Sequence, residues 1–243
     1  MPPPSDSWVG QFLARGLKFL HRAVHGRKAL LLLLLLSFVG PWVIFINVAE
    51  DLWESGGFIG DQPILRWLHA HSTPTLDSLA VGLTTVGGPL PMLGISAVLL
   101  AWLWYRHDYH DVMFFVLSVG GAMLLNLLVK LAFGRARPAL WESILPAKFY
   151  SFPSGHAMGS AAVAAAVGFL VVRYRGRWLA WVVGALFALG VGWSRVYLGV
   201  HYPSDVLAGW VGSLGWVGGL HILFSPYLRQ LRSWGKQLLG LVQ

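Results

Sequence analysis

Two histidines and one aspartate stand beside apolar stretches of the sequence, where their side chains could carry out nucleophilic and acid–base chemistry. His201 and Asp205 are four positions apart within "SRVYLGVHYPSD", and His156 closes the stretch "PSGH". Asp205 could hold the proton on one ring nitrogen of His201 and direct the lone pair of the other nitrogen at an electrophile. A second imidazole in a different environment could protonate a leaving oxygen. We therefore interpret His201 as a candidate nucleophile and His156 as a candidate general acid.

Three cations recur in or near the same stretches and could bind an anion. Lys130 and Arg137 lie in "KLAFGRARP", and Arg195 is the second residue of "SRVYLGVH", six positions before His201. Arginine offers paired N–H donors that match the oxygens of a phosphoryl group. "PSGH" opens an apolar segment, so Ser154 and Gly155 would lie at a helix start, where free N–H groups and the positive end of the helix dipole attract anions. Together with the histidines, this inventory suits a phosphate ester.

Each of these groups has another interpretation when it is taken alone. Lys130 could extend its ammonium group from a helix end to the membrane surface, and the two arginines could anchor lipid headgroups. "PSGH" could be a turn with Ser154 as an N-cap. His201 and Asp205 could be a hydrogen-bonded pair at a helix start or two metal ligands. Because the nearby cations would repel a dication, we expect no metal and no other cofactor, and the lack of cysteine excludes thiolate chemistry.

The composition is typical of a helical membrane protein. Of the 243 residues, 56% are hydrophobic and 12% are charged, and the mean hydropathy is +0.62. Several apolar runs of roughly 20 residues could each cross a ~30 Å hydrocarbon layer as a helix. The net charge of +8 comes from short basic clusters between these runs, not from one basic face, so we expect no nucleic-acid partner.

The predicted fold class is all-α, with six transmembrane helices in one bundle and amphipathic helices at the membrane surface. The spans are expected at residues 29–48, 76–105, 112–133, 157–172, 178–198 and 206–224. The second is too long for one straight crossing and contains "GGPLP", which predicts a break within it. Residues 1–28 and 225–243 are expected to be cytoplasmic amphipathic segments on either side of a six-span domain at residues 29–224.

The distribution of charge predicts which side of the membrane each end faces. With both termini in the cytoplasm, most of the 18 basic residues fall on the inner side, as the positive-inside rule expects. Four exceptions lie at the outer ends of predicted spans: Lys130, Arg135, Arg137 and Arg195. Because successive spans alternate in direction, the end of the third, the start of the fourth, the end of the fifth and the start of the sixth share this outer face. We therefore expect the polar residues at these four points to converge.

The three stretches, in this order, resemble the motifs of the type 2 phosphatidic acid phosphatase (PAP2) family. They read K-x6-R-P at residues 130–138, P-S-G-H at 153–156 and S-R-x5-H-x3-D at 194–205. The resemblance implies a set of residues that hold the phosphate: Lys130, Arg137, Ser154, Gly155 and Arg195. It also implies that His201 forms a phosphohistidine, that His156 protonates the leaving group and that Asp205 supports His201, without a metal.

The resemblance implies an integral membrane phosphatase of a lipid phosphate or pyrophosphate, such as undecaprenyl pyrophosphate, phosphatidylglycerophosphate or phosphatidate. A site at the headgroup level of the outer leaflet would let a lipid enter sideways with its tails still in hydrocarbon. We expect the protein in the cell (inner) membrane, among membrane lipids, with its active site on the periplasmic or extracellular face. A lipid phosphotransferase that uses the same histidine and a non-catalytic phospholipid binder or transporter are the alternatives.

Overall fold

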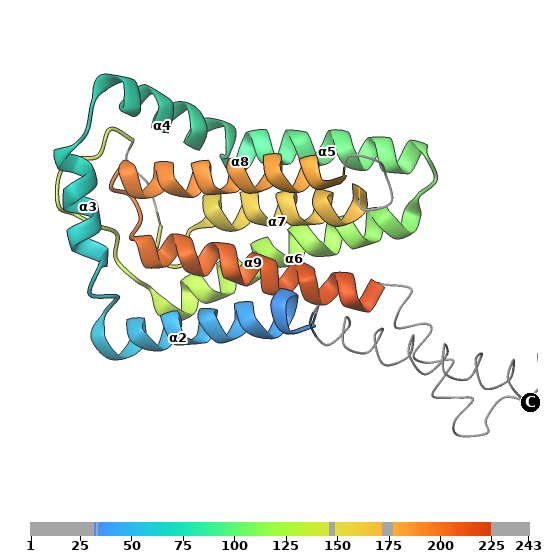
Figure 1. Ribbon diagram of the computed structural model, residues 1–243, viewed down its shortest axis with the longest axis horizontal. Helices are drawn as coiled ribbons and strands as arrows, with labels where there is room; N and C mark the ends of the chain where they lie inside the picture. The colour runs from blue at the N-terminus through green and yellow to red at the C-terminus, as the bar shows by residue number, and fades with distance from the viewer. Residues whose placement is uncertain (1–31, 33, 146–148, 172–176, 225–243) are drawn as a thin grey trace, which may run out of the picture.

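The computed structural model describes residues 32, 34–145, 149–171 and 177–224, and the elements within these ranges are helical (Figure 1). They are, in chain order, a π-helical turn η1 (Leu35–Val39), α2 (Gly40–Ser55), α3 (Asp61–Ala70), α4 (Pro74–Val86), α5 (Pro89–Tyr105), α6 (Tyr109–Phe133), α7 (Gly155–Leu170), α8 (Arg177–Tyr197) and α9 (Pro203–Phe224). The predicted all-α class is confirmed. The amphipathic segments predicted at residues 1–28 and 225–243 lie outside the described residues.

Within the described ranges, four helices are long and apolar enough to cross a membrane. They are Leu35–Ser55, Tyr109–Phe133, Trp178–Tyr197 and Pro203–Phe224. A fifth span results if α4 and α5, which are bent by 47° at their junction, are counted together. α7 is apolar but has 16 residues, which extend about 24 Å at ~1.5 Å per residue, short of a ~30 Å hydrocarbon layer. The protein is thus a multi-pass membrane protein, and the predicted count of six spans is not confirmed.

The break predicted at "GGPLP" separates α4 from α5. Gly87 follows the end of α4, and Gly88 precedes α5 in an extended conformation, with Pro89 as the first residue of the new helix. Proline suits this position because the first turn of a helix does not need its N–H group. A Cβ atom on Gly87 would lie 2.5 Å from a methyl group of Val191. Glycine therefore lets the break lie directly against α8, which carries Arg195.

α7 is the central helix of the bundle and packs against α6, α8 and α9. Figure 1 shows it running between α8 and α9. Its sequence, "GHAMGSAAVAAAVGFL", is rich in alanine and glycine, and most of the helix is buried. Small side chains let neighbouring backbones approach closely, which favours helix packing inside a membrane. This close packing fixes the first turn of α7, where the stretch at residues 153–156 lies.

One end of the bundle gathers the three stretches of candidate residues. There α6 ends, α7 begins, α8 ends and α9 begins, while α3 lies across this end between α2 and α4 (Figure 1). α6 ends at Gly134, whose positive φ of 57° is a left-handed conformation that glycine adopts without strain. α3 packs against α8 and α9. The alternation of helices thus brings four chain segments together, as the sequence predicts.

Candidate active site

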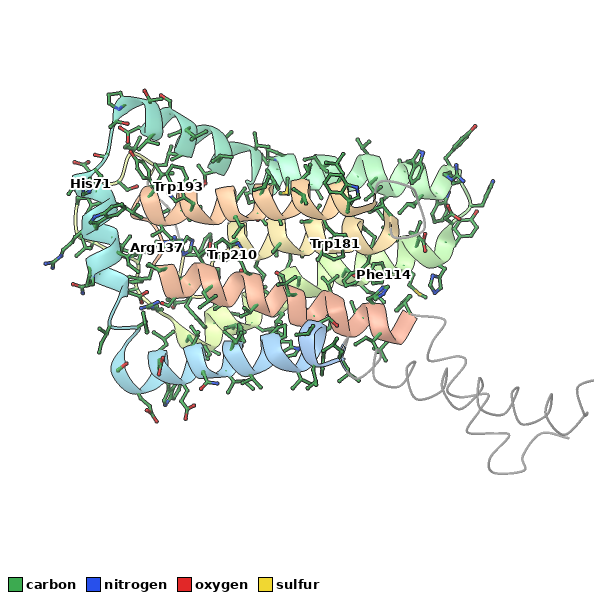
Figure 2. All side chains as sticks on the ribbon, in the orientation of Figure 1. His71, Phe114, Arg137, Trp181, Trp193 and Trp210 are labelled. Carbon is green, nitrogen blue, oxygen red and sulfur yellow. The ribbon has the colours of Figure 1, made fainter. Side chains whose placement is uncertain are left out.

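A cavity of about 680 Å³ opens where these helix ends meet. Its lining includes six of the predicted site residues: Lys130, Arg137, Gly155, His156, Arg195 and His201. Figure 2 labels Arg137 at this end of the bundle. The remaining two predicted residues, Ser154 and Asp205, are not part of the cavity lining, because both side chains are completely buried. The structure therefore brings both imidazoles and all three predicted cations to one cavity.

His201 lies in the short loop between α8 and α9, with its side chain buried and its two ring nitrogens in different surroundings. Nδ1 is 3.4 Å from Oδ2 of Asp205, and Nε2 is 3.1 Å from Nη1 of Arg137. Since a guanidinium N–H only donates, Nε2 must be the accepting nitrogen, which places the ring proton on Nδ1, facing the carboxylate. Burial, together with Arg195 and Arg137 and against the pull of Asp205, lowers the pKa of His201 to about 3. His201 is therefore a neutral imidazole at neutral pH, and the lone pair of its Nε2 faces Arg137, which lines the same cavity.

The heads of Lys130 and Arg137 are held by backbone carbonyl groups. Lys130 Nζ donates to the carbonyl oxygen of Tyr150 at 2.6 Å. Arg137 donates from Nη1 to Val200 at 2.7 Å and from Nε to Phe149 at 2.9 Å. A carbonyl oxygen orients a cation without neutralising its charge, unlike a carboxylate. Both side chains are thus aimed at the cavity as cations.

Arg195 is 5% exposed and reaches the cavity from the last turn of α8. Its Nη1 donates to the hydroxyl oxygen of Thr84 on α4 at 2.6 Å. Its Nε is buried and has no hydrogen-bond partner among the described residues. Buried polar groups are almost always paired, and an unpaired donor on a charged group is costly. Because Arg195 lines the cavity, we expect a bound phosphoryl group to draw its guanidinium round so that this donor is paired.

The start of α7 forms one wall of the cavity. Ser154 caps the helix, as the alternative interpretation of "PSGH" expects, by accepting from the N–H of Ala157 at 3.5 Å, and its own N–H donates to the carbonyl oxygen of Asp205 at 2.9 Å. A Cβ atom on Gly155 would lie 3.3 Å from Oδ1 of Asn126, so glycine allows α6 to approach the helix start closely. The N–H groups of Gly155 and His156, which line the cavity, and the positive end of the helix dipole are the parts of this turn that can face an anion.

His156 occupies the first turn of α7, half-buried and on the lining of the same cavity as His201. The ring of His156 lies next to the break between α4 and α5, because a Cβ atom on Gly88 would be 3.7 Å from its Nε2. Gly88 lines the cavity together with Thr84 and Thr85. The break in the second predicted span therefore supplies the cavity wall beside the candidate general acid.

Four residues of the site were not predicted from the sequence. Thr84 holds Arg195, and Ser151 donates a hydrogen bond to Asp205. Asp61, on α3, and Arg135, in the loop after α6, form buried ion pairs around Asp205. Among these four, Arg135 has a signal in the sequence, because it is an outer-face cation at a variable position of the K-x6-R-P motif, but this signal indicates no role.

Among the residues that the structure describes, no group of three or more His, Asp or Glu side chains is placed to hold a metal ion. The carboxylate nearest to His201 is Asp205, and it is already engaged by Arg135. Catalysis without a metal or cofactor stays a prediction from the charge of the site, and the assay proposed below tests it.

Comparison with known proteins identifies the family. The profile of the PAP2 superfamily matches residues 111–229, which include all three motifs. Phosphatidylglycerophosphatase B of Bacillus subtilis is 31% identical over 182 residues, which cover 73% of this chain and 88% of that protein. An undecaprenyl-diphosphatase of Sulfolobus acidocaldarius is 26% identical over 206 residues, covering 79% of this chain and 88% of that protein.

The fold is also found among solved structures. The crystal structure of a transmembrane PAP2-type phosphatidylglycerolphosphate phosphatase from Bacillus subtilis superposes with a TM-score of 0.69 and 26% identity, covering 79% of this chain and 96% of that one. Motif order, helix arrangement and overall sequence similarity thus agree. The chain belongs to the PAP2 superfamily of membrane phosphatases.

Proposed function

We propose that this protein is an integral membrane phosphatase that hydrolyses a lipid phosphate or pyrophosphate through a phosphohistidine formed on His201. The observation that carries the proposal is the cavity that joins two imidazoles with three cations, one of which has a buried donor without a partner in the described part of the chain. A tetrahedral oxyanion would satisfy that donor and balance the positive charge. The names of the relatives, which include phosphatases of phosphatidylglycerophosphate, undecaprenyl diphosphate and lipid A, support the substrate class.

In the first step, Nε2 of His201 attacks the phosphorus while the bond to the leaving oxygen breaks. Asp205 keeps the Nδ1 proton in place and stabilises the imidazolium that forms. Lys130, Arg137 and Arg195 stabilise the charge on the phosphoryl oxygens, which is the main contribution a protein makes to phosphoryl transfer. His156 donates its proton to the leaving oxygen, and positioned acid catalysis of this kind is typically worth ~10² to 10⁴ in rate.

In the second step, the neutral His156 takes a proton from a water molecule, whose oxygen attacks the phosphorus. The bond between phosphorus and Nε2 of His201 breaks, inorganic phosphate leaves, and both histidines return to their starting states. Burial and, after it, the cations that line the cavity lower the pKa of His156, and a bound phosphate dianion offsets the repulsion by the cations. Substrate binding thus supports the protonation state that the first step requires.

The rim of the cavity supports a substrate with hydrocarbon tails. Exposed apolar side chains line it at the start of α5, near the end of α6 and in the loop after α6: Leu90, Leu127, Leu131, Leu145 and Phe149. A lipid could place its phosphate among the cations while its tails stay beside these helices in the bilayer. A water-soluble phosphate ester would gain nothing from such a rim.

The positive-inside pattern supports an orientation in which the cavity faces the outer side of the cell membrane and both termini face the cytoplasm. In this arrangement residues 29–224 form the catalytic unit, and residues 1–28 and 225–243 lie along the inner surface. Single cysteines can test this orientation when they are introduced at exposed positions such as Glu54 and Tyr105. They are then treated with a reagent that does not cross the membrane. We expect only the cysteine near the cavity end, at position 54, to react in intact cells.

Release of inorganic phosphate from lipid phosphates by the purified protein in detergent micelles tests the function. We expect turnover with excess EDTA, none with His201→Ala, and full turnover with the matched control His71→Ala, because His71 is exposed directly after α3. Activity that is lost in EDTA and restored by a divalent ion would refute the metal-free mechanism. Wild-type protein without turnover on any lipid phosphate or diphosphate would refute the function, and transfer of label to a second lipid would favour a phosphotransferase.

A further inference from the structure

Arg135 lies between two buried carboxylates, those of Asp61 and Asp205, which come from distant parts of the chain. Its Nη1 is 2.6 Å from Oδ1 of Asp205, and its Nη2 is 2.8 Å from Oδ2 of Asp61. The side chains of all three residues are less than a tenth exposed. Although burial alone lowers it, the two carboxylates raise the pKa of Arg135 above its ordinary value. A planar guanidinium with several donors suits this bridging position better than an ammonium group.

Further contacts make the arrangement rigid. Arg135 Nη1 also donates to the hydroxyl oxygen of Ser204 at 2.8 Å, and the guanidinium lies 4.0 Å from the ring centre of Tyr202. Asp61 accepts from the N–H of Ser204 at 3.0 Å and from its hydroxyl at 2.6 Å. The cluster of Arg135, Asp61, Ser204 and Asp205 thus ties α3 and the loop after α6 to the first turn of α9.

This cluster lies behind the catalytic pair, on the side away from the substrate. Arg135 and Asp61 line a second cavity of about 590 Å³, near the end of α2, and neither is on the lining of the catalytic cavity. The two carboxylate oxygens of Asp205 have different partners: Oδ1 faces Arg135, while Oδ2 faces His201, Ser151 and the N–H of Tyr202. Arg135 therefore holds one oxygen and leaves the other for the imidazole.

We infer that Arg135 is a positioning residue, which fixes the carboxylate of Asp205 so that His201 is held in the tautomer and orientation needed for attack, and that Asp61 in turn fixes Arg135. The inference rests on the proposed function of His201 as the nucleophile. Because Arg135 does not touch the cavity, its loss should reduce the rate of the chemical step more than the affinity for substrate. A misplacement of about 1 Å at a reacting group can lower the rate about a hundred-fold.

The test compares Arg135→Gln, Arg135→Lys and Asp61→Asn with wild type and with Arg66→Gln, a control that removes an exposed arginine from α3. We expect kcat to fall about a hundred-fold in Arg135→Gln, with KM changed less than three-fold and with Arg66→Gln unaffected. Arg135→Lys keeps the charge but cannot bridge both carboxylates. Its kcat should therefore lie between that of wild type and that of Arg135→Gln. Size-exclusion profiles and thermal unfolding give the folded fraction by which each rate is corrected.

The pH profile provides a readout that a purely structural role would not move. The groups around His201 are Lys130 on α6, His156 on α7, Arg195 on α8, Asp205 on α9 and Arg137 in the loop before α7, and none of them is altered in these variants. Removing the positive charge of Arg135 leaves more of the Asp205 charge acting on His201 and raises the pKa of that imidazole. Removing the negative charge of Asp61 acts in the opposite direction. The acid limb of kcat/KM should therefore move up in Arg135→Gln and move down or stay in Asp61→Asn.

Several outcomes would overturn the inference while the proposed function stands. One is a folded Arg135→Gln with wild-type kcat and an unmoved acid limb, while His201→Ala is inactive. If Arg135→Gln does not fold, Arg135→Lys carries the test through kcat, and a wild-type kcat in that folded variant has the same meaning. A loss expressed only as a higher KM would show that Arg135 acts on binding instead. Wild-type protein that releases no phosphate would refute the proposed function itself.

Discussion

Replacing Thr84 by valine removes a single hydroxyl group from the wall that holds Arg195. Valine keeps the shape of threonine, so the change isolates the hydrogen bond of 2.6 Å that Thr84 accepts from Nη1 of Arg195. Both residues are buried, and Nε of Arg195 already has no partner among the described residues. After the substitution, the guanidinium would have a second buried N–H without a partner. It would then be free to turn away from the phosphate position.

The size of the effect follows from the energy of a hydrogen bond to a charged group. Such a bond contributes about 1.5 to 3 kcal/mol when its loss leaves a buried group unpaired. At ~1.4 kcal/mol for each factor of ten, kcat/KM should fall about ten- to hundred-fold in Thr84→Val. The measurement is phosphate release at several substrate concentrations, with Thr75→Val as the control, because Thr75 is exposed on the first turn of the same helix.

A double-mutant cycle then shows whether Thr84 acts through Arg195. In an Arg195→Lys background, the planar donor that Thr84 orients is already gone, so adding Thr84→Val should cause less than a three-fold further loss. Equal effects in both backgrounds would show that Thr84 acts independently of Arg195. A folded Thr84→Val with the same kcat/KM as Thr75→Val would refute the assignment of Thr84 as the residue that aims Arg195.

Three further predictions concern the fold and the protonation of the site. Gly87→Ala should lower the free energy of unfolding by roughly 1 to 3 kcal/mol, since the added Cβ atom would overlap Val191. Thermal unfolding measures this change. An unchanged free energy of unfolding would contradict close packing at the break between α4 and α5. Ser154→Ala should remove the cap of α7 and lower the free energy of unfolding by about 1 kcal/mol. It should also lower kcat/KM. A loss of stability with unchanged kcat/KM would mean that the helix start does not bind phosphate. Because burial lowers the pKa of His201 to about 3, its ring should stay neutral as the pH falls from 8 to 5. Nitrogen NMR of histidine-labelled protein measures the protonation of the ring, and the His201→Ala variant assigns its signal. A ring that titrated near pH 6.5 would contradict the prediction.

Local features of the site could be predicted because their physics is confined to neighbouring residues. Gly134 ends α6 because a left-handed residue is needed there, and Ser154 caps α7 because its hydroxyl reaches an N–H three residues ahead. The break at residues 87–88 follows from adjacent glycines and prolines. Alternating apolar runs also predict that the helix ends carrying Lys130 and His201 share one face.

Contacts between distant parts of the chain were decided by the tertiary structure. Arg135 meets Asp61 across 74 positions, and Arg195 meets Thr84 across 111 positions. Such pairs depend on how each helix is rotated about its axis and where the broken span rests on α8, and hydropathy carries no information on either. The number of spans was likewise not determined by apolar length, since α7 has 16 residues and is enclosed by other helices.

The sequence by itself determined the class of protein, the ends of several helices and the side chains that could bind and attack a phosphate. The tertiary structure decided which partners hold those side chains. The physical reason is that a charge or a cap acts on its neighbours in the chain, whereas the orientation of a buried arginine or carboxylate is set by whichever groups the packed helices place within about 3 Å of it.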